Sequence, residues 1–316
     1  MKISGFTMGK NVSKLYYPIK QAIESILPIC DEFVVALGDS DDDDTAREEI
    51  LSIGSDKIKI IDTVWDIEKY SRGTENAHQT DIAREACTGD WLFYVQADEV
   101  VHEKYLPIIK AKCEEFLDDH EVEGLLFNYK HFWGDYDHYF KSKGWYGQEI
   151  RVVRNHPDIH SFWSAQSFRR IPDFDYVDYR EKEGTYKLNV AKIDAEIYHY
   201  GWVRPPHLMM NKQKSLTTIH SNKEHADAIY KDRGVEFDYG PLNLAKKFDD
   251  THPKVMSDWI AKFNWTDKLY DKGPLRTRAN KLKHDKLKYK IVEWLEDTFN
   301  GGKQILGYTN WKVIRK

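Results

Sequence analysis

The stretch Trp91-Leu92-Phe93-Tyr94-Val95-Gln96-Ala97-Asp98-Glu99 carries the strongest indication of the fold. It starts with five apolar residues in a row, and Gly89-Asp90 precedes them. A short apolar run that is rich in aromatic residues is typical of a strand buried on both faces. Asp98 and Glu99 then lie at the carboxyl end of this strand, where open α/β sheets bind their ligands. An exposed turn that caps a following helix is the alternative for the two carboxylates.

Strand-like and helix-like segments alternate on both sides of this stretch. Short apolar runs predict strands, and apolar residues at helical spacing predict helices. The alternation predicts a mostly parallel sheet with helices on both faces. The expected strands span residues 3–6, 33–37, 57–61, 91–95 and 125–129, and the expected helices span residues 14–27, 45–52, 75–87 and 103–117.

The character of the chain changes twice after residue 130. Residues 130–200 are aromatic and broken by turns, which predicts short strands that extend the sheet in an antiparallel manner. From Pro205-Pro206 onward the pattern is helical and highly charged. We therefore expect one domain over residues 1–205 and a helical, basic C-terminal region over residues 206–316.

The composition predicts a folded protein that does not bind nucleic acid. The chain has 316 residues, of which 41% are hydrophobic, and a formal net charge of −5. A net negative charge argues against a general attraction to nucleic acid. Three cysteines without metal-type spacing predict reduced, buried thiols. Because the sequence shows no signal-peptide pattern and no apolar stretch of membrane-spanning length, we expect a soluble, cytoplasmic protein.

The motifs in their order resemble those of the family-two glycosyltransferases, which are inverting enzymes of the GT-A fold that use nucleotide-activated sugars. The resemblance covers residues 1 to about 205. It implies a GT-A-type mostly parallel central sheet flanked by helices, with an antiparallel extension and a helical C-terminal region. The residues that carry it are Asp39-Ser40 with Thr45, Thr88-Gly89-Asp90-Trp91, Gln96-Ala97-Asp98-Glu99 and His199-Tyr200-Gly201.

The resemblance implies a hexosyltransferase-like reaction. A sugar would pass with inversion from a nucleotide-sugar donor, expected to be a UDP-sugar, to a glycan or lipid-linked acceptor. Such a reaction would belong to the synthesis of a cell-surface polysaccharide or lipopolysaccharide. The residues expected to bind the donor are Thr7, Asp39, Arg72, Gln96 and Asp98, with an ordinary surface position as the alternative for Arg72.

A divalent cation is the cofactor that the resemblance implies. The family's acidic motif usually begins with Asp, and here Gln96 stands at that position; its amide can hydrogen-bond a ribose but cannot hold a cation as a charged ligand. The metal-bearing Asp of the motif falls on Asp98, and His199 matches the family's metal-binding His. We expect Mn²⁺ or Mg²⁺ at Asp98, His199 and Glu99, where it neutralises the leaving diphosphate. The alternative for His199 is a hydrogen-bonded core position.

Inversion also requires a general base that takes the proton of the acceptor hydroxyl. Glu149, on the acceptor side beyond the core sheet, is the first candidate, and Asp135 and Asp137 in the preceding loop are the further candidates. An ion pair with Arg151 or Arg154 is the alternative for Glu149.

Aromatic and basic residues outside these motifs suggest how an acceptor is bound. Trp133, Trp145 and Trp163 could stack on an acceptor sugar, with core packing as the alternative for each. Residues 276–290 contain seven Lys or Arg and one Asp. These charges fit either a solvated helix face or a peripheral contact with the inner face of an anionic membrane.

Two other functions stay open at the level of the sequence. A nucleotidyltransferase would share the sheet and the acidic stations, but its Gly-rich, basic phosphate loop has only a faint counterpart in Thr7-Met8-Gly9-Lys10-Asn11. A non-catalytic nucleotide-binding protein of the GT-A fold is the second, and Gln96 is the reason to consider it.

Overall fold

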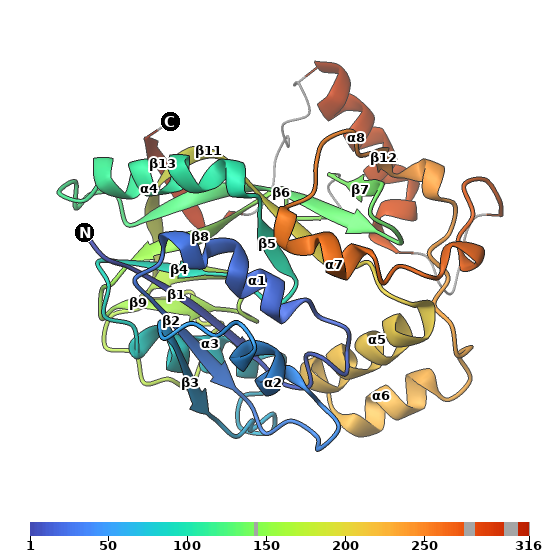
Figure 1. Cartoon of the computed structure of the whole chain (residues 1–316), viewed down its shortest axis with the longest axis horizontal. Coiled ribbons are helices and arrows are strands. Elements are labelled where there is room, and N and C mark those ends of the chain that lie inside the picture. Colours follow the sequence, from blue (N-terminus) through green and yellow to red (C-terminus); the bar gives the residue numbers. More distant parts are fainter. Residues whose placement is uncertain (142–144, 275–281, 300–308, 316) are drawn as a thin grey trace.

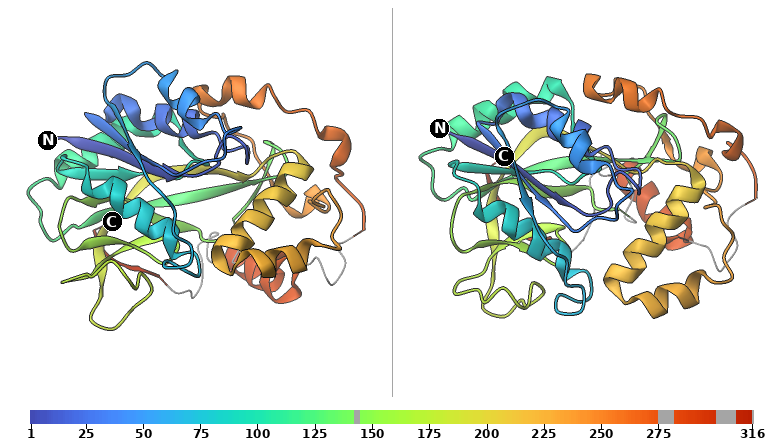
Figure 2. Two further views of the ribbon diagram at one scale, coloured as in Figure 1. Left: turned by 90° about the horizontal axis from the view of Figure 1, so that it is seen from below. Right: turned by 60° about the horizontal axis from the view of Figure 1, so that its bottom comes forward.

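The structure, a computed structural model, describes residues 1–141, 145–274, 282–299 and 309–315 (Figure 1). Over these residues, one 13-stranded sheet follows the order β3-β2-β1-β4-β8-β6-β11-β10-β9 along its main path, and β5, β7, β12 and β13 pair at its side. Helices flank this curled, mostly parallel sheet on both faces (Figures 1 and 2). The α/β architecture expected from the sequence and from the GT-A resemblance is confirmed.

The N-terminal strands form one parallel part of the sheet. They are β1 (Ile3–Gly9), β2 (Glu32–Leu37), β3 (Ile58–Asp62) and β4 (Trp91–Tyr94). Strand β1 pairs with β2 and β4, and β2 pairs with β3, all in parallel. Trp91 and Phe93 of β4 enter one hydrophobic core, whereas Leu92 and Tyr94 enter another. The apolar run is therefore continuous because each face of β4 lies in a core.

Four helices cover this part of the sheet. Helices α1 (Ile19–Ile26), α2 (Ala46–Leu51) and α4 (Leu106–Glu115) pack in one core, and α3 (Thr74–Glu85) packs in the other. The expectation that the first helix begins at residue 14 is wrong. It begins at residue 19 because a proline at position 18 disfavours a helical conformation at the residue before it.

Antiparallel strands extend the sheet, as expected. They include β5 (Glu99–Val101), β6 (Gly124–Trp133), β7 (His138–Phe140), β8 (Gln148–Arg154), β9 (Ile159–Phe162) and β10 (Ser167–Arg170). Strand β8 pairs in an antiparallel manner with both β4 and β6, and β10 does so with β9 and β11.

Strand β11 (Tyr186–Trp202) is much longer than expected, with 17 residues. The expectation that residues 130–200 form only short strands is wrong for this segment, and His199 lies within β11. Irregular pairing with β6 between Lys192 and Glu196, and again between His199 and Trp202, bends the strand. The sequence hides this length because the bends interrupt the regular alternation of buried and exposed residues.

The region after residue 205 contributes both helices and strands. Its helices are α5 (Pro206–His220), α6 (Lys223–Tyr230), α7 (Ser257–Ile260) and α8 (Leu287–Phe299), and its strands are β12 (Lys246–Lys247) and β13 (Trp311–Arg315).

Along the described chain, short 3₁₀ turns lie at Leu27–Ile29, Glu103–Tyr105, Leu242–Leu244, Lys254–Met256, Thr266–Lys268 and Lys283–Asp285.

The two parts of the chain are packed together. Strand β13 pairs in parallel with β11, β12 pairs with β7, and Met256, Trp259 and Trp265 share a core with Tyr198 and Tyr200. Helices α5 and α6 lie side by side beside the sheet in Figure 2. The division at residue 205 stays a prediction.

The expected basic segment, residues 276–290, lies partly outside the described residues, which resume at residue 282. A search of the described helices finds none with the length and apolar character needed to cross a bilayer.

Candidate active site

A cavity of about 1340 Å³ opens where β1 and β4 end. Met8, Gly9 and Lys10 line it at the end of β1, and residues 96–98 line it after β4. Strands β6, β8, β11 and β13 and helices α3, α5 and α8 also contribute lining residues. The cavity therefore lies at the carboxyl edge of the parallel strands, where α/β sheets bind ligands, and helix α5 of the C-terminal region lines it too.

Asp98 lies in the turn between β4 and β5 and is buried. Its backbone carbonyl accepts a hydrogen bond from the Tyr200 N–H, 2.8 Å away. Its Oδ2 atom lies 3.6 Å from His199 Nε2 and 3.4 Å from Lys212 Nζ. Burial by itself would raise the pKa of Asp98, but His199, Lys212 and Arg204 outweigh it and hold this pKa below its usual value. Asp98 is therefore an ionised carboxylate in the cavity wall.

The tautomer of His199 follows from a second histidine. His131 Nε2 lies 2.7 Å from the Tyr146 carbonyl oxygen, and His131 Nδ1 lies 3.1 Å from His199 Nδ1. Burial lowers the pKa of both imidazoles and thereby favours the neutral form of each ring. Because a carbonyl only accepts, His131 donates from Nε2 and accepts at Nδ1. His199 must then donate from Nδ1, which leaves a lone pair on its Nε2 atom, toward Asp98.

Asp98 Oδ2 and His199 Nε2 are thus two electron-pair donors beside each other, an arrangement that a cation would stabilise. Gly201 leaves room next to both atoms: a Cβ at this position would lie 2.4 Å from Asp98 Oδ2 and 2.7 Å from His199 Nε2. An oxygen and an imidazole nitrogen are suitable ligands for Mn²⁺.

The protein supplies only part of a coordination shell at this point. Among the described residues, no group of three or more His, Cys, Asp or Glu side chains could hold a metal ion. Ions such as Mg²⁺ are commonly held by one or two carboxylates together with substrate phosphates and water. The pair Asp98 and His199 therefore fits a cation that binds together with a diphosphate.

Glu99 lies apart from this pair, in a buried ion pair with Arg151. Both carboxylate oxygens accept from the guanidinium at 2.7 Å, and Oε1 also accepts from the Tyr129 hydroxyl at 2.8 Å. Both side chains of the ion pair are fully buried. The carboxylate links β5, β6 and β8. Because both of its oxygens already accept hydrogen bonds from Arg151 and Tyr129, the structure does not support the expectation that Glu99 is a metal ligand. The alternative of an exposed turn at Asp98 and Glu99 is wrong, because both are buried.

Glu149 lines the cavity from β8. The ion pair considered for it is not made: Arg151 binds Glu99, and Arg154 donates to backbone carbonyl oxygens. Glu149 Oε2 is buried and has no hydrogen-bond partner among the described residues. Burial raises the pKa of Glu149 to about 8, and the charge of Arg151 offsets this only in part. Such a carboxyl can exchange a proton near neutral pH.

The other two candidate bases do not line the cavity. Asp135 holds the turn between β6 and β7, where both of its oxygens lie 2.9 Å from His138 Nδ1. Asp137 is exposed in the same turn. The structure therefore does not bring either residue together with Asp98.

The residues expected to bind the donor are only partly brought together. Gln96 and Asp98 line the cavity. Asp39 lies just outside it and binds two lining residues, Lys10 Nζ at 2.8 Å and the Trp65 N–H at 2.9 Å. Thr7 is fully buried and Arg72 is exposed, and neither is part of the lining.

Gln96 has a structural contact that its place in the motif did not indicate. Its Nε2 donates to the Ala165 carbonyl oxygen at 2.9 Å. Ala165 belongs to the loop between β9 and β10, in which Trp163 and Ala165 have φ angles of 62° and 59°. Left-handed conformations of such residues are strained and persist where the surroundings enforce them. Gln96 thus holds in place a strained loop that contributes Trp163 to the cavity.

Aromatic side chains form much of the cavity wall. Trp145 and Trp163 line it, whereas Trp133 is buried in a core. Sequence reasoning did not single out Lys212 or His131, which line the same cavity. Lys212 lies in an amphipathic helix without a recognisable motif, and His131 lies in an aromatic strand, so neither carried a signal of its role. The remaining aromatic lining residues are Tyr17, Trp65, Tyr146, Trp202, Tyr289 and Trp311.

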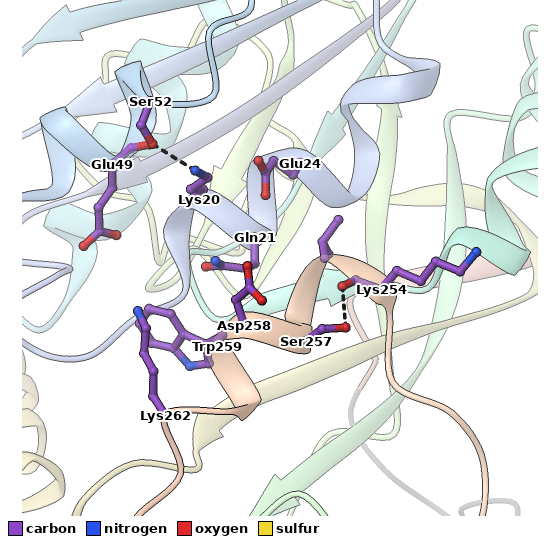
Figure 3. Close-up of a pocket in the computed structure, with 11 residues that line it drawn as sticks. Lys20, Gln21, Glu24, Glu49, Ser52, Lys254, Ser257, Asp258, Trp259 and Lys262 are labelled. Carbon is purple, nitrogen blue, oxygen red and sulfur yellow. Dashed lines mark hydrogen bonds between the residues drawn. The ribbon is translucent and has the colours of Figure 1, made fainter.

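A second, smaller hollow of about 480 Å³ lies between α1 and the segment that contains α7 (Figure 3). Three lysines and three carboxylates line it, and Lys20 Nζ donates to Ser52 Oγ at 2.9 Å. The opposite charges balance there, so the hollow has the character of a solvated surface groove. None of the predicted site residues contributes to it.

Comparisons with known proteins find likeness in solved structures alone. No protein-family model matches the chain, and neither does any curated protein. Glucosyl-3-phosphoglycerate synthase from Mycobacterium tuberculosis, in complex with Mn²⁺, UDP and phosphoglyceric acid, is 17% identical over 41% of this chain and 43% of that chain, with a TM-score of 0.28. TarS from S. aureus is 14% identical over 72% of this chain and 42% of that chain, with a TM-score of 0.38. The chain spans less than half the length of either solved protein.

Proposed function

We propose that this protein is a divalent-metal-dependent glycosyltransferase that moves a sugar from a UDP-sugar to a hydroxyl acceptor with inversion. One observation carries the proposal: a single cavity at the carboxyl edge of the sheet holds both the pair Asp98 and His199 and the carboxyl of Glu149, whose Oε2 atom has no hydrogen-bond partner among the described residues. The first two fit a cation with a diphosphate, and the third fits a proton acceptor. The family resemblance of the motifs points to the same chemistry.

The donor end of the cavity is formed around Asp98. Lys10, Trp65 and Asn76 line the wall near the end of β1 and offer an aromatic ring and polar groups to a nucleoside. A bound Mn²⁺ or Mg²⁺ would be held by Asp98 and His199 and would neutralise charge on the departing diphosphate. Asp39, which positions Lys10 and Trp65, supports this wall from outside.

Glu149 is proposed as the general base. Its carboxylate accepts the proton of the acceptor hydroxyl as the acceptor oxygen bonds to the anomeric carbon. The bond from that carbon to the diphosphate breaks, and the electron pair leaves with the diphosphate. A base with a pKa near 8 is well matched to a hydroxyl proton at neutral to mildly alkaline pH.

The test of this proposal is a screen of nucleotide sugars for donor hydrolysis and sugar transfer, with Mn²⁺, with Mg²⁺ and with a chelator. We expect turnover of a UDP-sugar in the presence of metal, and none with Asp98→Asn. Asp135→Asn is the matched control, because it removes a carboxylate that lies outside the cavity. Turnover by Asp98→Asn at the wild-type rate would overturn the cation assignment. A folded protein that turns over no nucleotide sugar would overturn the function.

Two further assays, of pyrophosphate release and of UDP binding, distinguish the two other candidate functions. A nucleotidyltransferase would release pyrophosphate from a nucleoside triphosphate and a sugar phosphate, and a non-catalytic protein would bind UDP without turnover. Gln96 was the reason to consider a non-catalytic protein. Its hydrogen bond to Ala165 gives Gln96 a structural role, and this role is compatible with catalysis.

We also propose that the acceptor is a glycan or a lipid-linked glycan in the synthesis of a cell-surface polysaccharide, reached by peripheral contact with an anionic membrane. Helix α8 supports this contact. Lys286 and Lys288 are exposed at its N-terminal end. Its large apolar side chains recur at helical spacing, lie on one face and are 36–73% exposed; they are Leu287, Ile291, Trp294, Leu295 and Phe299. Amphipathic helices with Trp, Phe, Leu and Lys bind at the membrane interface.

Co-sedimentation with vesicles tests this contact. Wild-type protein should sediment with phosphatidylglycerol vesicles and much less with phosphatidylcholine vesicles, because each basic residue near an anionic surface adds about 1 kcal/mol. Trp294→Glu with Phe299→Glu should abolish sedimentation. Val235→Glu, at an exposed apolar residue outside α8, is the control. Equal sedimentation of the α8 variant and wild type would contradict the proposal.

A further inference from the structure

Lys212 is a buried lysine at the donor end of the cavity with no part in the reaction described so far. It lies on α5, is 4% exposed and lines the cavity. Its Nζ atom donates to the Gly201 carbonyl oxygen at 2.5 Å and lies 3.4 Å from Asp98 Oδ2. It also lies 5.1 Å from the ring centre of Tyr17 and 5.6 Å from that of Trp202. The ammonium is therefore held at the carboxylate that we assign to the cation site.

The contacts of Lys212 leave donor capacity for a ligand. An ammonium has three N–H donors, and Gly201 and Asp98 account for two of them. Burying an ammonium is costly unless it is paired, and at 3.4 Å the contact with Asp98 is a loose one. Arg204, the other cation nearby, donates to backbone carbonyl oxygens and is absent from the cavity lining.

The charge balance of the site favours an anionic ligand at Lys212. The donor end of the lining contains one carboxylate, Asp98, because Gln96 occupies the place of a second one. A basic side chain thus lies 3.4 Å from the Asp98 carboxylate before any metal binds. A nucleoside diphosphate carries two to three negative charges, so an ammonium fixed next to its binding place would attract it.

We propose that Lys212 is a built-in cation of the donor site, which binds diphosphate oxygens and neutralises part of the charge on the leaving group. The inference rests on the proposed function for the identity of the ligand, a nucleoside diphosphate. When the diphosphate binds, the Lys212 ammonium donates to its oxygens while it keeps the Gly201 contact. Lys212 and a metal would then share the charge of the diphosphate, and binding without metal would depend on Lys212.

The experiment measures binding of inorganic pyrophosphate and of UDP by calorimetry, in a chelator and in Mn²⁺. Wild-type protein should bind both ligands in the chelator, and Lys212→Gln should bind them about tenfold or more weakly, as expected for losing a hydrogen bond to a charged group. Lys212→Arg should retain most of the affinity. Lys214→Gln is the matched control, because Lys214 lies on the same helix, half-exposed, and pairs with Asp227.

Asp98→Asn tests whether Lys212 binds the anion directly. If Lys212 had only a structural role, this variant would not show pyrophosphate binding that depends on Lys212. In the chelator this variant should bind pyrophosphate at least as tightly as wild type, because it frees Lys212 and removes a negative charge. In Mn²⁺ it should bind UDP more weakly than wild type. The double variant Asp98→Asn, Lys212→Gln removes both charges of the pair and should therefore fold even if Lys212→Gln alone does not. It should lose pyrophosphate binding in the chelator.

The possible results separate this inference from the proposed function. If Lys212→Gln binds like wild type, or the double variant like Asp98→Asn, Lys212 is not a diphosphate ligand. If wild type binds neither ligand in the chelator, the inference is overturned, and UDP binding in Mn²⁺ would still support the function. Lys212-dependent pyrophosphate binding without turnover of any nucleotide sugar would support the anion site and overturn the glycosyltransferase assignment.

Discussion

The proposed cation site requires a residue without a Cβ atom at position 201. The place of Gly201 in the motif His199-Tyr200-Gly201 is explained by the space it leaves, since a Cβ there would approach both Asp98 Oδ2 and His199 Nε2. Such a close approach to two ligand atoms displaces at least one of them. The backbone of Gly201 is not in the left-handed region, so an alanine would act through its methyl group alone.

We therefore expect Gly201→Ala to weaken Mn²⁺ binding in the presence of UDP by about 10–100-fold, the range found when the support of a metal ligand is disturbed. The electron paramagnetic resonance signal of free Mn²⁺ measures this. Gly234→Ala is the control, because no atom lies within 4 Å of a Cβ at that position. Unchanged Mn²⁺ binding by Gly201→Ala would place the cation elsewhere.

The proposed role of Glu149 as the base can be tested independently of the cation site. Glu149→Gln keeps the shape of the side chain and removes the basic atom, so UDP binding should persist while transfer falls by roughly 10²-fold or more. The wild-type transfer rate should rise with pH as Glu149 loses its proton, up to a plateau above a pKa of about 8. This limb should be absent in the variant. Transfer at the wild-type rate by Glu149→Gln would exclude it as the base.

At the scale of the elements, strand register brings the site together. Strand β5 pairs with β11 so that Glu99 is opposite His199, and β6 pairs with β11 so that His131 is opposite the same residue. The turn before β5 then places Asp98 beside His199. The pairing of these three strands explains why residues far apart in the sequence, at positions 98, 131 and 199, lie side by side.

The ion pair of Glu99 and Arg151 stabilises this register, because it links β5 to β8 and, through Tyr129, to β6. Removing one partner of a fully buried pair leaves an uncompensated charge. Glu99→Gln should therefore lower the free energy of unfolding by about 3–5 kcal/mol in urea titrations. Lys112→Gln, which removes a partner of an exposed pair with Glu115, should cost at most about 1 kcal/mol. Similar losses for the two variants would contradict a structural role for Glu99.

At the scale of the whole molecule, the cavity joins the N-terminal sheet to the C-terminal region. Strands β1, β6, β8 and β11 and the turn after β4 line it, and α5, α8 and β13 contribute Lys212, Tyr289 and Trp311. A ligand in this cavity contacts both parts of the chain. Its binding should therefore stabilise the molecule as one unit, whichever residue marks the boundary between the parts.

UDP with Mn²⁺ should raise the free energy of unfolding by about 2.7 kcal/mol when UDP is present at 100 times its Kd. Thermal unfolding followed by circular dichroism should then show one transition at a higher temperature. Mn²⁺ alone should have a smaller effect, because the proposed site offers it two ligands from the described residues, Asp98 and His199. Two separate transitions, of which UDP shifts only the first, would show that the two parts unfold independently.

The sequence by itself determined the α/β class, the parallel strands and the position of Asp98 at a strand end. These features depend on local patterns: continuous apolar runs, helical spacing and the acids that follow β4. The order of the motifs also indicated His199 as a candidate metal ligand, and the position of Glu149 beyond the core sheet indicated it as a candidate base. Such signals are contained in a few neighbouring residues, so they can be read without knowing which strands pair.

Only the tertiary structure decided what each candidate can do. Glu99 and Asp98 are neighbours in the chain, yet one lies in a buried ion pair with Arg151 and the other lines the cavity. Lys212 became a site residue only through the packing of α5 against Gly201 and Asp98. The physical reason is that the proton affinity, accessibility and partners of a side chain depend on contacts between segments that are distant in sequence, and no local pattern encodes those contacts.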